Sequence, residues 1–170
     1  MSPLPLDQAP AKADIFIDAN IFVYGLSEES AQCRDFLRRC STEELTDICL
    51  FETVNEATHV FMRAEAQAKG LISKSNPAKQ LRQNFGVVKN LDQYWNKTLQ
   101  ILSLNLLFLP LDQEILLGAQ KERAGSGLLT NDSMLIGCMR AYGITALATS
   151  DVDFERVPGI VVYGPGDITI

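Results

Sequence analysis

Four acidic side chains in four separate segments have the clearest chemical potential in this sequence: Asp18, Glu56, Asp132 and Asp151. Carboxylates that lie close together repel one another, which raises their pKa values unless a cation lies between them. Oxygen donors suit hard divalent cations such as Mg²⁺ or Mn²⁺, whereas Zn²⁺ prefers histidine and cysteine. If the fold brings these acids together, the sequence therefore predicts a magnesium or manganese site.

Each acid also has an ordinary structural explanation. Asp18, Asp132 and Asp151 all stand where a helix cap or a turn former would serve. Glu56 is more informative, because its neighbours Val54 and Ala57 are expected to be buried, and a buried glutamate needs a partner or a metal ion. Taken together, the four acids favour one shared site over four separate caps.

Strands and helices that alternate along the chain are expected to position these acids. Short apolar runs predict five strands, near residues 14–18, 48–51, 105–110, 144–148 and 160–163. Apolar residues at helical spacing predict helices over residues 28–41, 53–64, 112–123 and 131–142. The alternation indicates a parallel sheet covered by helices on both faces, with ligands bound beyond the carboxyl ends of the strands.

Two segments lie outside this alternation. Residues 1–13 contain three prolines and little apolar periodicity, which predicts a flexible N-terminal arm before a single domain over residues 14–170. Residues 65–105 predict a helical projection. Its apolar face either packs on the domain's own body or joins two copies of the chain in a homodimer. The residues of this face are Leu81, Phe85, Val88, Leu91 and Trp95.

Charge is distributed unevenly along the chain. The 170 residues include 15 basic and 21 acidic side chains, a net charge of −6 that argues against nonspecific coating of nucleic acid. Residues 63–97, however, hold seven basic side chains and only two acidic ones. This segment is typical either of a surface that contacts phosphates or an acidic partner, or of a solvated lysine-rich helix face.

Several protein classes fit the sequence poorly. It has neither a signal peptide pattern nor an apolar run long enough to span a bilayer, so we expect a cytoplasmic protein with no membrane partner. Its four cysteines lack C-x-x-C spacing, which predicts reduced, buried thiols. It contains no phosphate-binding glycine motif. His59 is its single histidine and is expected to be a packed or surface side chain, which disfavours a Ser-His-Asp hydrolase.

Four motifs, in order and spacing, resemble those of the PIN domain family. They are IFIDANI at residues 15–21, VNEA at 54–57, LTND at 129–132 and TSDVDFERVPGI at 149–160. The closing motif is the most specific of them. The resemblance implies a three-layer α/β/α sandwich and a metal-dependent endoribonuclease, similar to the VapC-type toxins of toxin–antitoxin pairs.

The resemblance also implies roles for individual residues. Asp18, Glu56, Asp132 and Asp151 correspond to the family's acidic tetrad, which binds Mg²⁺ or Mn²⁺. Asp153 corresponds to a fifth acid, and Asn20 and Thr149 to polar support.

Two kinds of partner follow from this reading, RNA and an antitoxin protein. We expect Lys79, Arg82 and Lys89 of the basic segment to contact RNA. The alternative is a catalytically weak PIN-like module that binds RNA or a protein partner.

Overall fold

A computed structural model describes residues 3–168, and its centre is a six-stranded sheet whose neighbouring strands are all parallel. In sheet order the strands are β1 (Leu4–Pro5), β6 (Val161–Gly164), β5 (Ala146–Ala148), β2 (Asp14–Ile17), β3 (Thr46–Cys49) and β4 (Leu107–Phe108). The predicted parallel sheet is thus confirmed. Five of these strands were expected from their apolar runs, and β1 is an additional edge strand.

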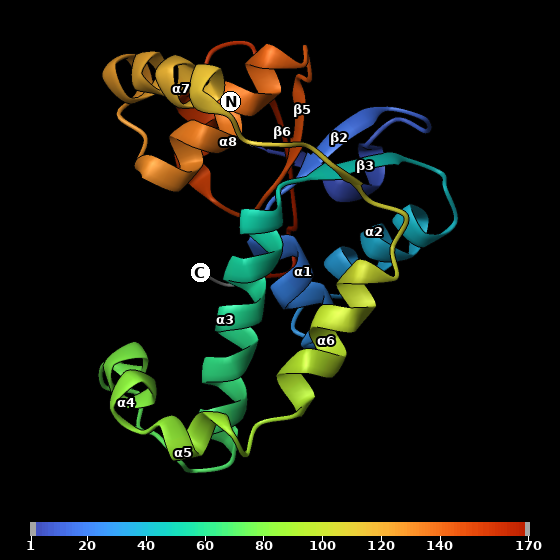
Figure 1. The fold of residues 1–170 in the computed structure, drawn as a ribbon. Helices are drawn as coiled ribbons and strands as arrows, with labels where there is room; N and C mark the ends of the chain where they lie inside the picture. The colour runs from blue at the N-terminus through green and yellow to red at the C-terminus, as the bar shows by residue number, and fades with distance from the viewer. Residues whose placement is uncertain (1–2, 169–170) are drawn as a thin grey trace.

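Helices cover both faces of this sheet (Figure 1). Ile15 and Ile17 of β2 contact the helices of one face, whereas Phe16 contacts those of the other, as the two-residue period of a strand requires. The first face is covered by α1 (Ala19–Leu26), α2 (Ala31–Ser41), α3 (Phe51–Ala68) and α6 (Gln93–Leu102). The second is covered by α7 (Gln113–Ser126), α8 (Thr130–Ala141) and the short η2 (Val152–Arg156).

The predicted three-layer sandwich is therefore confirmed. No helix within residues 3–168 combines the length and the apolar character that crossing a membrane requires. All four cysteines are buried free thiols, and burial raises the pKa of Cys33 and of Cys138 to about 11.

Helices α1 and α2 differ most from the sequence prediction, while α3 and α7 extend a few residues beyond their predicted ends. Helix α1 follows β2 directly and was not expected, because its eight residues are too few to show a clear period. Helix α2 begins at Ala31 rather than at residue 28. Glu28 has a positive φ of 60°, which a helix does not allow, and the Ser30 hydroxyl accepts a hydrogen bond from the Cys33 amide at 2.9 Å.

The N-terminal residues are not the flexible arm that their prolines suggested. Leu4 and Pro5 pair with Tyr163 and Gly164 of β6, and Leu6 is 1% exposed. The Arg39 guanidinium donates hydrogen bonds to the carbonyl oxygens of residues 6, 7 and 9. These contacts come from residues far along the chain, so local periodicity could not predict them. Residues 1 and 2 of the expected arm lie outside the described residues.

The expected helical projection contains α4 (Pro77–Gln83) and α5 (Phe85–Val88), while α6 returns along α3 and joins the main core through Ile101. Leu81 and Leu91 are buried with Ala66 and Ile72 in a small separate cluster. The apolar face that was considered for dimerisation is therefore largely packed on the chain's own body. Only Phe85 and Trp95 of that face remain well exposed.

Glu65 joins the end of α3 to the beginning of α6. Its buried carboxylate accepts hydrogen bonds from the backbone amides of Asp92, at 3.0 Å, and Tyr94, at 2.8 Å, and it pairs with Lys69 at 2.6 Å. Burial alone would raise the pKa of Glu65. The Lys69 ammonium and the backbone amides outweigh burial and lower this pKa from its ordinary value of 4.5 to about 2.

We expect Glu65→Gln to lower the free energy of unfolding by about 1–3 kcal/mol at pH 7, because charge-assisted hydrogen bonds are lost in a buried position. Since the native pKa of Glu65 is lowered, its contribution is fully present above pH 4.5 and is lost as the pH falls towards 2. Denaturant unfolding at pH 7 and pH 3 should show a smaller difference between wild type and variant at the lower pH. Asp35→Asn, which removes an exposed ion pair with Arg38, is the control with little expected effect.

Candidate active site

Asp18 lies at the carboxyl end of β2, where hydrogen bonds hold its carboxylate in one orientation. Its Oδ1 accepts from the Ala19 amide at 2.7 Å, and its Oδ2 accepts from the Thr149 hydroxyl at 2.7 Å and from the Asn20 side-chain amide at 2.5 Å. Asp18 thereby caps α1. The expectation of a helix cap and the expectation of a site residue both apply to this one side chain.

Thr149 and Asn20 connect Asp18 to the segment after β5. The Thr149 hydroxyl oxygen accepts a hydrogen bond from the Asp151 amide at 3.0 Å, and the Asn20 side-chain oxygen accepts from the Ser150 amide at 3.0 Å. Thr149 is fully buried. Because β2 and β5 are neighbours in the sheet, these side chains fix the segments that carry Asp18 and Asp151 relative to each other.

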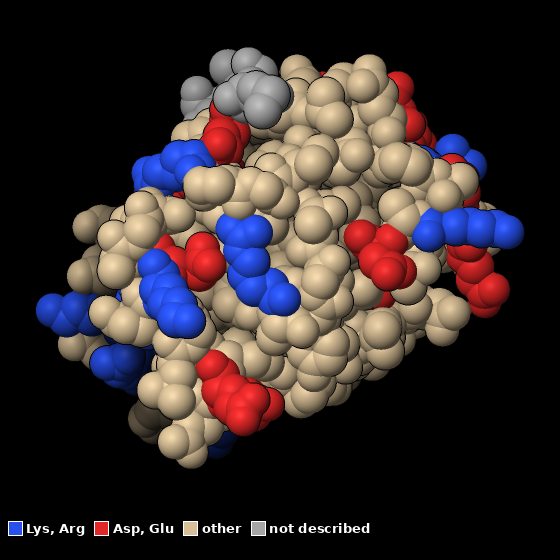
Figure 2. Space-filling view, turned by 90° about the horizontal axis from the view of Figure 1, so that it is seen from above, with Lys and Arg blue, Asp and Glu red and all other residues tan. Residues whose placement is uncertain are grey.

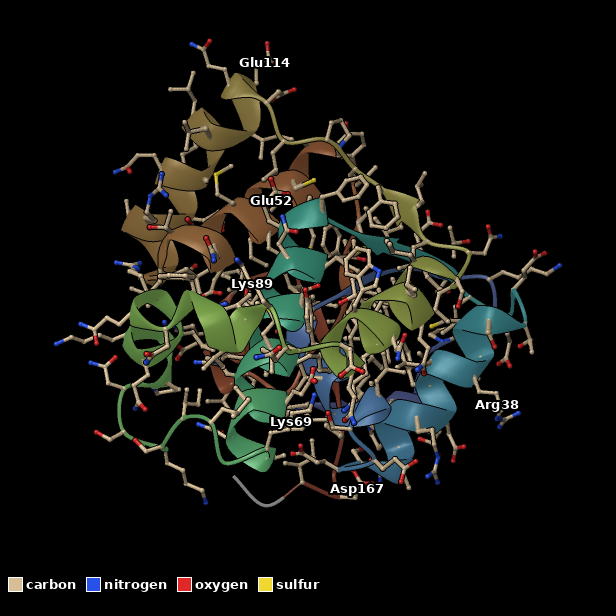
Figure 3. The ribbon with its side chains drawn as sticks, turned by 60° about the horizontal axis from the view of Figure 1, so that its bottom comes forward. Arg38, Glu52, Lys69, Lys89, Glu114 and Asp167 are labelled. Atoms are coloured by element: carbon tan, nitrogen blue, oxygen red, sulfur yellow. The ribbon has the colours of Figure 1, made fainter. Side chains whose placement is uncertain are left out.

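A cavity of about 60 Å³ collects acids from three different elements. Asp18 from the end of β2, Glu56 from α3 and Asp132 from the first turn of α8 all line it. Glu52, which lies one turn before Glu56 on the same side of α3, lines it as well (Figure 3). Sequence analysis missed Glu52, although its spacing of four residues from Glu56 was a usable signal.

The acids are close enough to influence one another's ionisation. The pKa of Asp18 is raised from 3.8 to about 6, mainly by burial and in smaller part by the charges of Glu56 and Asp132, against the opposing hydrogen bonds from Thr149 and Ala19. The pKa of Asp132 is raised by burial and then by the charges of Asp151, Glu56 and Asp153. The fold therefore brings all four predicted acids into one electrostatic cluster.

Glu56 reaches this cluster from an exposed position, so the inference that it is buried was wrong. Val54 and Ala57 are buried as expected. Consecutive residues of a helix point about 100° apart, however, which leaves Glu56 facing away from the core beside them. His59, one turn further along α3, is also exposed.

Asp153 differs from the other acids because it already has a basic partner. Its Oδ1 lies 2.9 Å from Nη1 of Arg156, and Arg156 also donates to the backbone carbonyl oxygens of Ser126, at 2.7 Å, and Gly127, at 3.3 Å. Arg156 thus holds the turn between α7 and α8 that precedes Asp132. This role of Arg156 could not be predicted from the sequence, because its partners lie about 30 residues away.

The donor set of the cavity fits a hard divalent cation. Its charged lining groups among the described residues are all carboxylates, with no lysine or arginine to balance them, and the pKa values of Asp18 and Asp132 are raised. Within residues 3–168, no three His, Cys, Asp or Glu side chains are placed as a ready-made metal site. A bound cation would therefore require small side-chain adjustments, for which exposed Glu56 and Glu52 have the freedom.

The basic residues expected to contact RNA lie outside this cavity. Lys79 and Arg82 are on α4, and Lys89 directly follows α5. All three are exposed, and Figure 1 shows α4 and α5 beside the end of α3 that is farther from the sheet, away from Glu52 and Glu56. A larger cavity of about 500 Å³ lies between α7 and α8 and contains the Glu122–Arg140 ion pair but none of the four acids.

Comparisons with known proteins agree with this architecture. The family model described as PIN domain matches residues 15–160. Among solved structures, VapBC2 from Rickettsia felis bound to a DNA fragment from its promoter is similar at a TM-score of 0.57 and 16% identity, over 89% of this chain and 98% of that one. A toxin–antitoxin complex from Klebsiella pneumoniae is similar at a TM-score of 0.53 and 14% identity, over 93% and 100% of the two chains. No curated protein matches significantly.

Proposed function

This chain belongs to the PIN domain family, and we propose that it is a metal-dependent endoribonuclease that hydrolyses RNA phosphodiester bonds at its cluster of acids. One observation supports the proposal most strongly: the four acids come from four segments, and the charges of Glu56, Asp132 and Asp151 help to raise the pKa values of Asp18 and Asp132. Carboxylates that repel one another lower the stability of the folded state, and such clusters are typical of functional sites.

In this proposal Asp18, Asp132 and Asp151 hold one Mg²⁺ or Mn²⁺, and Asp153 adds negative charge beside them. A divalent ion at such a site lowers the pKa of a bound water and neutralises charge on the scissile phosphate. Asn20 and Thr149 keep the Asp18 carboxylate oriented, so that little reorganisation is needed when the cation and the phosphate bind.

Glu56 has a different part in the proposed reaction. It is exposed at the cavity, so it can accept a proton from the attacking water or hold a second cation. Glu52 lies beside it and strengthens the local negative potential. The departing 3′ oxygen receives its proton from solvent, because the cavity lining among the described residues contains no lysine, histidine or tyrosine to donate one.

An antitoxin protein is the proposed partner. The two similar structures are described as toxin–antitoxin complexes, and each is similar over nearly its whole matched chain. We therefore propose that this chain acts as the toxin of a VapBC-type pair. Co-expression with a protein encoded by a neighbouring gene, followed by co-purification, tests this assignment independently of catalysis.

We expect the purified protein to cleave a mixed panel of RNAs in Mg²⁺ or Mn²⁺, and EDTA to reduce the cleavage rate by about a hundredfold or more. Adding excess metal after EDTA should restore activity. Cleavage that is indifferent to EDTA would contradict the proposal. A folded protein that binds metal and RNA without cutting would instead support the alternative, a catalytically weak RNA-binding or partner-binding module.

A further inference from the structure

The segment that contains α4 and α5 is positively charged, although the protein as a whole is acidic. Residues 66–91 contain five basic side chains and no acidic ones. Lys69 is paired with Glu65 and Asp92, but the other four form no ion pair with any residue in the described range. We call Lys74, Lys79, Arg82, Lys89 and the nearby Phe85 the basic platform. By contrast, acidic and basic side chains are interspersed on the face shown in Figure 2.

Phe85 gives this platform an unusual aromatic group. It is 74% exposed, at the start of α5, and the Lys89 ammonium lies 5.8 Å from the centre of its ring. The residues around it in sequence, from Gln83 to Gly86, are exposed and otherwise polar or small. An apolar docking surface would need several exposed apolar neighbours, which this segment lacks.

An exposed aromatic ring among unpaired cations is the combination that binds single-stranded nucleic acid. Bases stack on the ring irrespective of their identity, while the cations pair with the phosphates on either side. A base on the ring of Phe85 would bring its neighbouring phosphate near Lys89. Duplex RNA cannot stack in this way, because its bases are already stacked and paired with one another.

The platform lies within reach of the proposed catalytic cavity. Its helices pack on α3 through Met62 and Ala66, which follow Glu56 by six and ten residues. At about 1.5 Å per helical residue, these contacts lie roughly 9–15 Å beyond Glu56 along the axis of α3, a distance that a short single strand can bridge. Arg63 lies between the two sites, and its Nε has no partner among the described residues.

We propose that the basic platform selects unpaired RNA by stacking one base on Phe85, a few nucleotides from the scissile phosphate, while Lys89 and Arg82 bind adjacent phosphates. The distance in nucleotides rests on the proposed nuclease function. The stacking itself does not, because it can be measured without catalysis.

The test is the affinity of the full chain for a fluorescent 12-nucleotide RNA of mixed sequence, measured by anisotropy in EDTA so that no cleavage occurs. We expect Phe85→Leu to weaken binding about tenfold and Phe85→Trp to bind at least as tightly as wild type, because Trp stacks and Leu does not. The double variant Arg82→Glu, Lys89→Glu should weaken binding further, whereas Arg34→Glu, Arg38→Glu, at two exposed positions of α2, is the matched charge control. Affinity for the same sequence as a duplex should be insensitive to Phe85→Leu.

Equal affinities for wild type, Phe85→Leu and Phe85→Trp would overturn the proposal, as would equal losses for single-stranded and duplex RNA. These outcomes are separable from a failure of the nuclease function. RNA binding that depends on the Phe85 ring, without any metal-dependent cleavage, would support the stacking proposal and contradict the nuclease proposal. Metal-dependent cleavage with RNA binding that does not depend on the ring would support the nuclease proposal and contradict the stacking proposal.

Discussion

Asp132→Asn is expected to reduce metal-dependent RNA cleavage by about a hundredfold or more, and at the same time to stabilise the fold slightly. Asp132 lies in the first turn of α8 and lines the acidic cavity. An amide has nearly the shape of the carboxylate but lacks the charge that attracts a cation. Loss of the charge removes an essential ligand in the proposed mechanism and therefore removes transition-state stabilisation.

The expected gain in stability has the same physical origin. The pKa of Asp132 is raised by burial and by Asp151, Glu56 and Asp153, so its ionised form is disfavoured in the folded protein. No described residue donates a hydrogen bond to its carboxylate that would be lost with the charge. We expect the variant to unfold at a higher denaturant concentration than wild type in EDTA at pH 7, because the substitution removes the charge that burial and the neighbouring acids disfavour.

Asp14→Asn is the matched control for this experiment. Asp14 is exposed at the amino end of β2, opposite the end that carries Asp18, so both cleavage and stability should stay near the wild-type values. Cleavage by Asp132→Asn at the wild-type rate would remove Asp132 from the mechanism and would point to a contaminating nuclease. A variant that loses activity and also stability would indicate a structural rather than a catalytic role.

The sequence predicted the acids of this site best where they follow the ends of strands, because ligands of a parallel sheet bind beyond those ends. Asp18 directly follows one apolar run and Asp151 follows another after two polar residues, and parallel strands place such residues at the same edge of the sheet. The place of Asp132 could be predicted because it follows a glycine-containing turn and lies in the first turn of a helix. The parallel sheet with helices on both faces followed from the same alternation of apolar runs and helical periods.

Features that depend on distant partners could not be read in this way. The edge strand at Leu4–Pro5 pairs with β6, and Arg39 donates hydrogen bonds to carbonyl oxygens of the residues that follow it. Neither partner lies nearby in the sequence. Arg156 fixes the turn before α8 through carbonyl oxygens of Ser126 and Gly127. Glu56 was placed correctly in the cluster but for the wrong reason, because adjacent helical residues do not share burial.

Thr149→Val is expected to lower cleavage by about ten- to a hundredfold, because this threonine orients an acid of the site without belonging to the reacting groups. The two side chains have nearly the same shape, so the substitution removes the hydroxyl alone. That hydroxyl donates to Asp18 and accepts from the Asp151 amide. Its loss also raises the pKa of Asp18 further, since the hydrogen bond from Thr149 lowers it at present.

Stability should fall in the same variant, by about 1–3 kcal/mol, because Thr149 is fully buried and its partners would be left without a hydrogen bond.

Thr98→Val is the matched control. Thr98 is also buried and hydrogen-bonded, to Thr58 and the Tyr94 carbonyl, but it lies on α6 away from the acids. It should lose stability and keep its activity when both variants are assayed well below their unfolding temperatures. Equal losses of activity in the two variants would show that Thr149 acts only through the stability of the fold. A loss confined to Thr149→Val, accompanied by weaker Mn²⁺ binding in calorimetry, would place its effect on the orientation of Asp18.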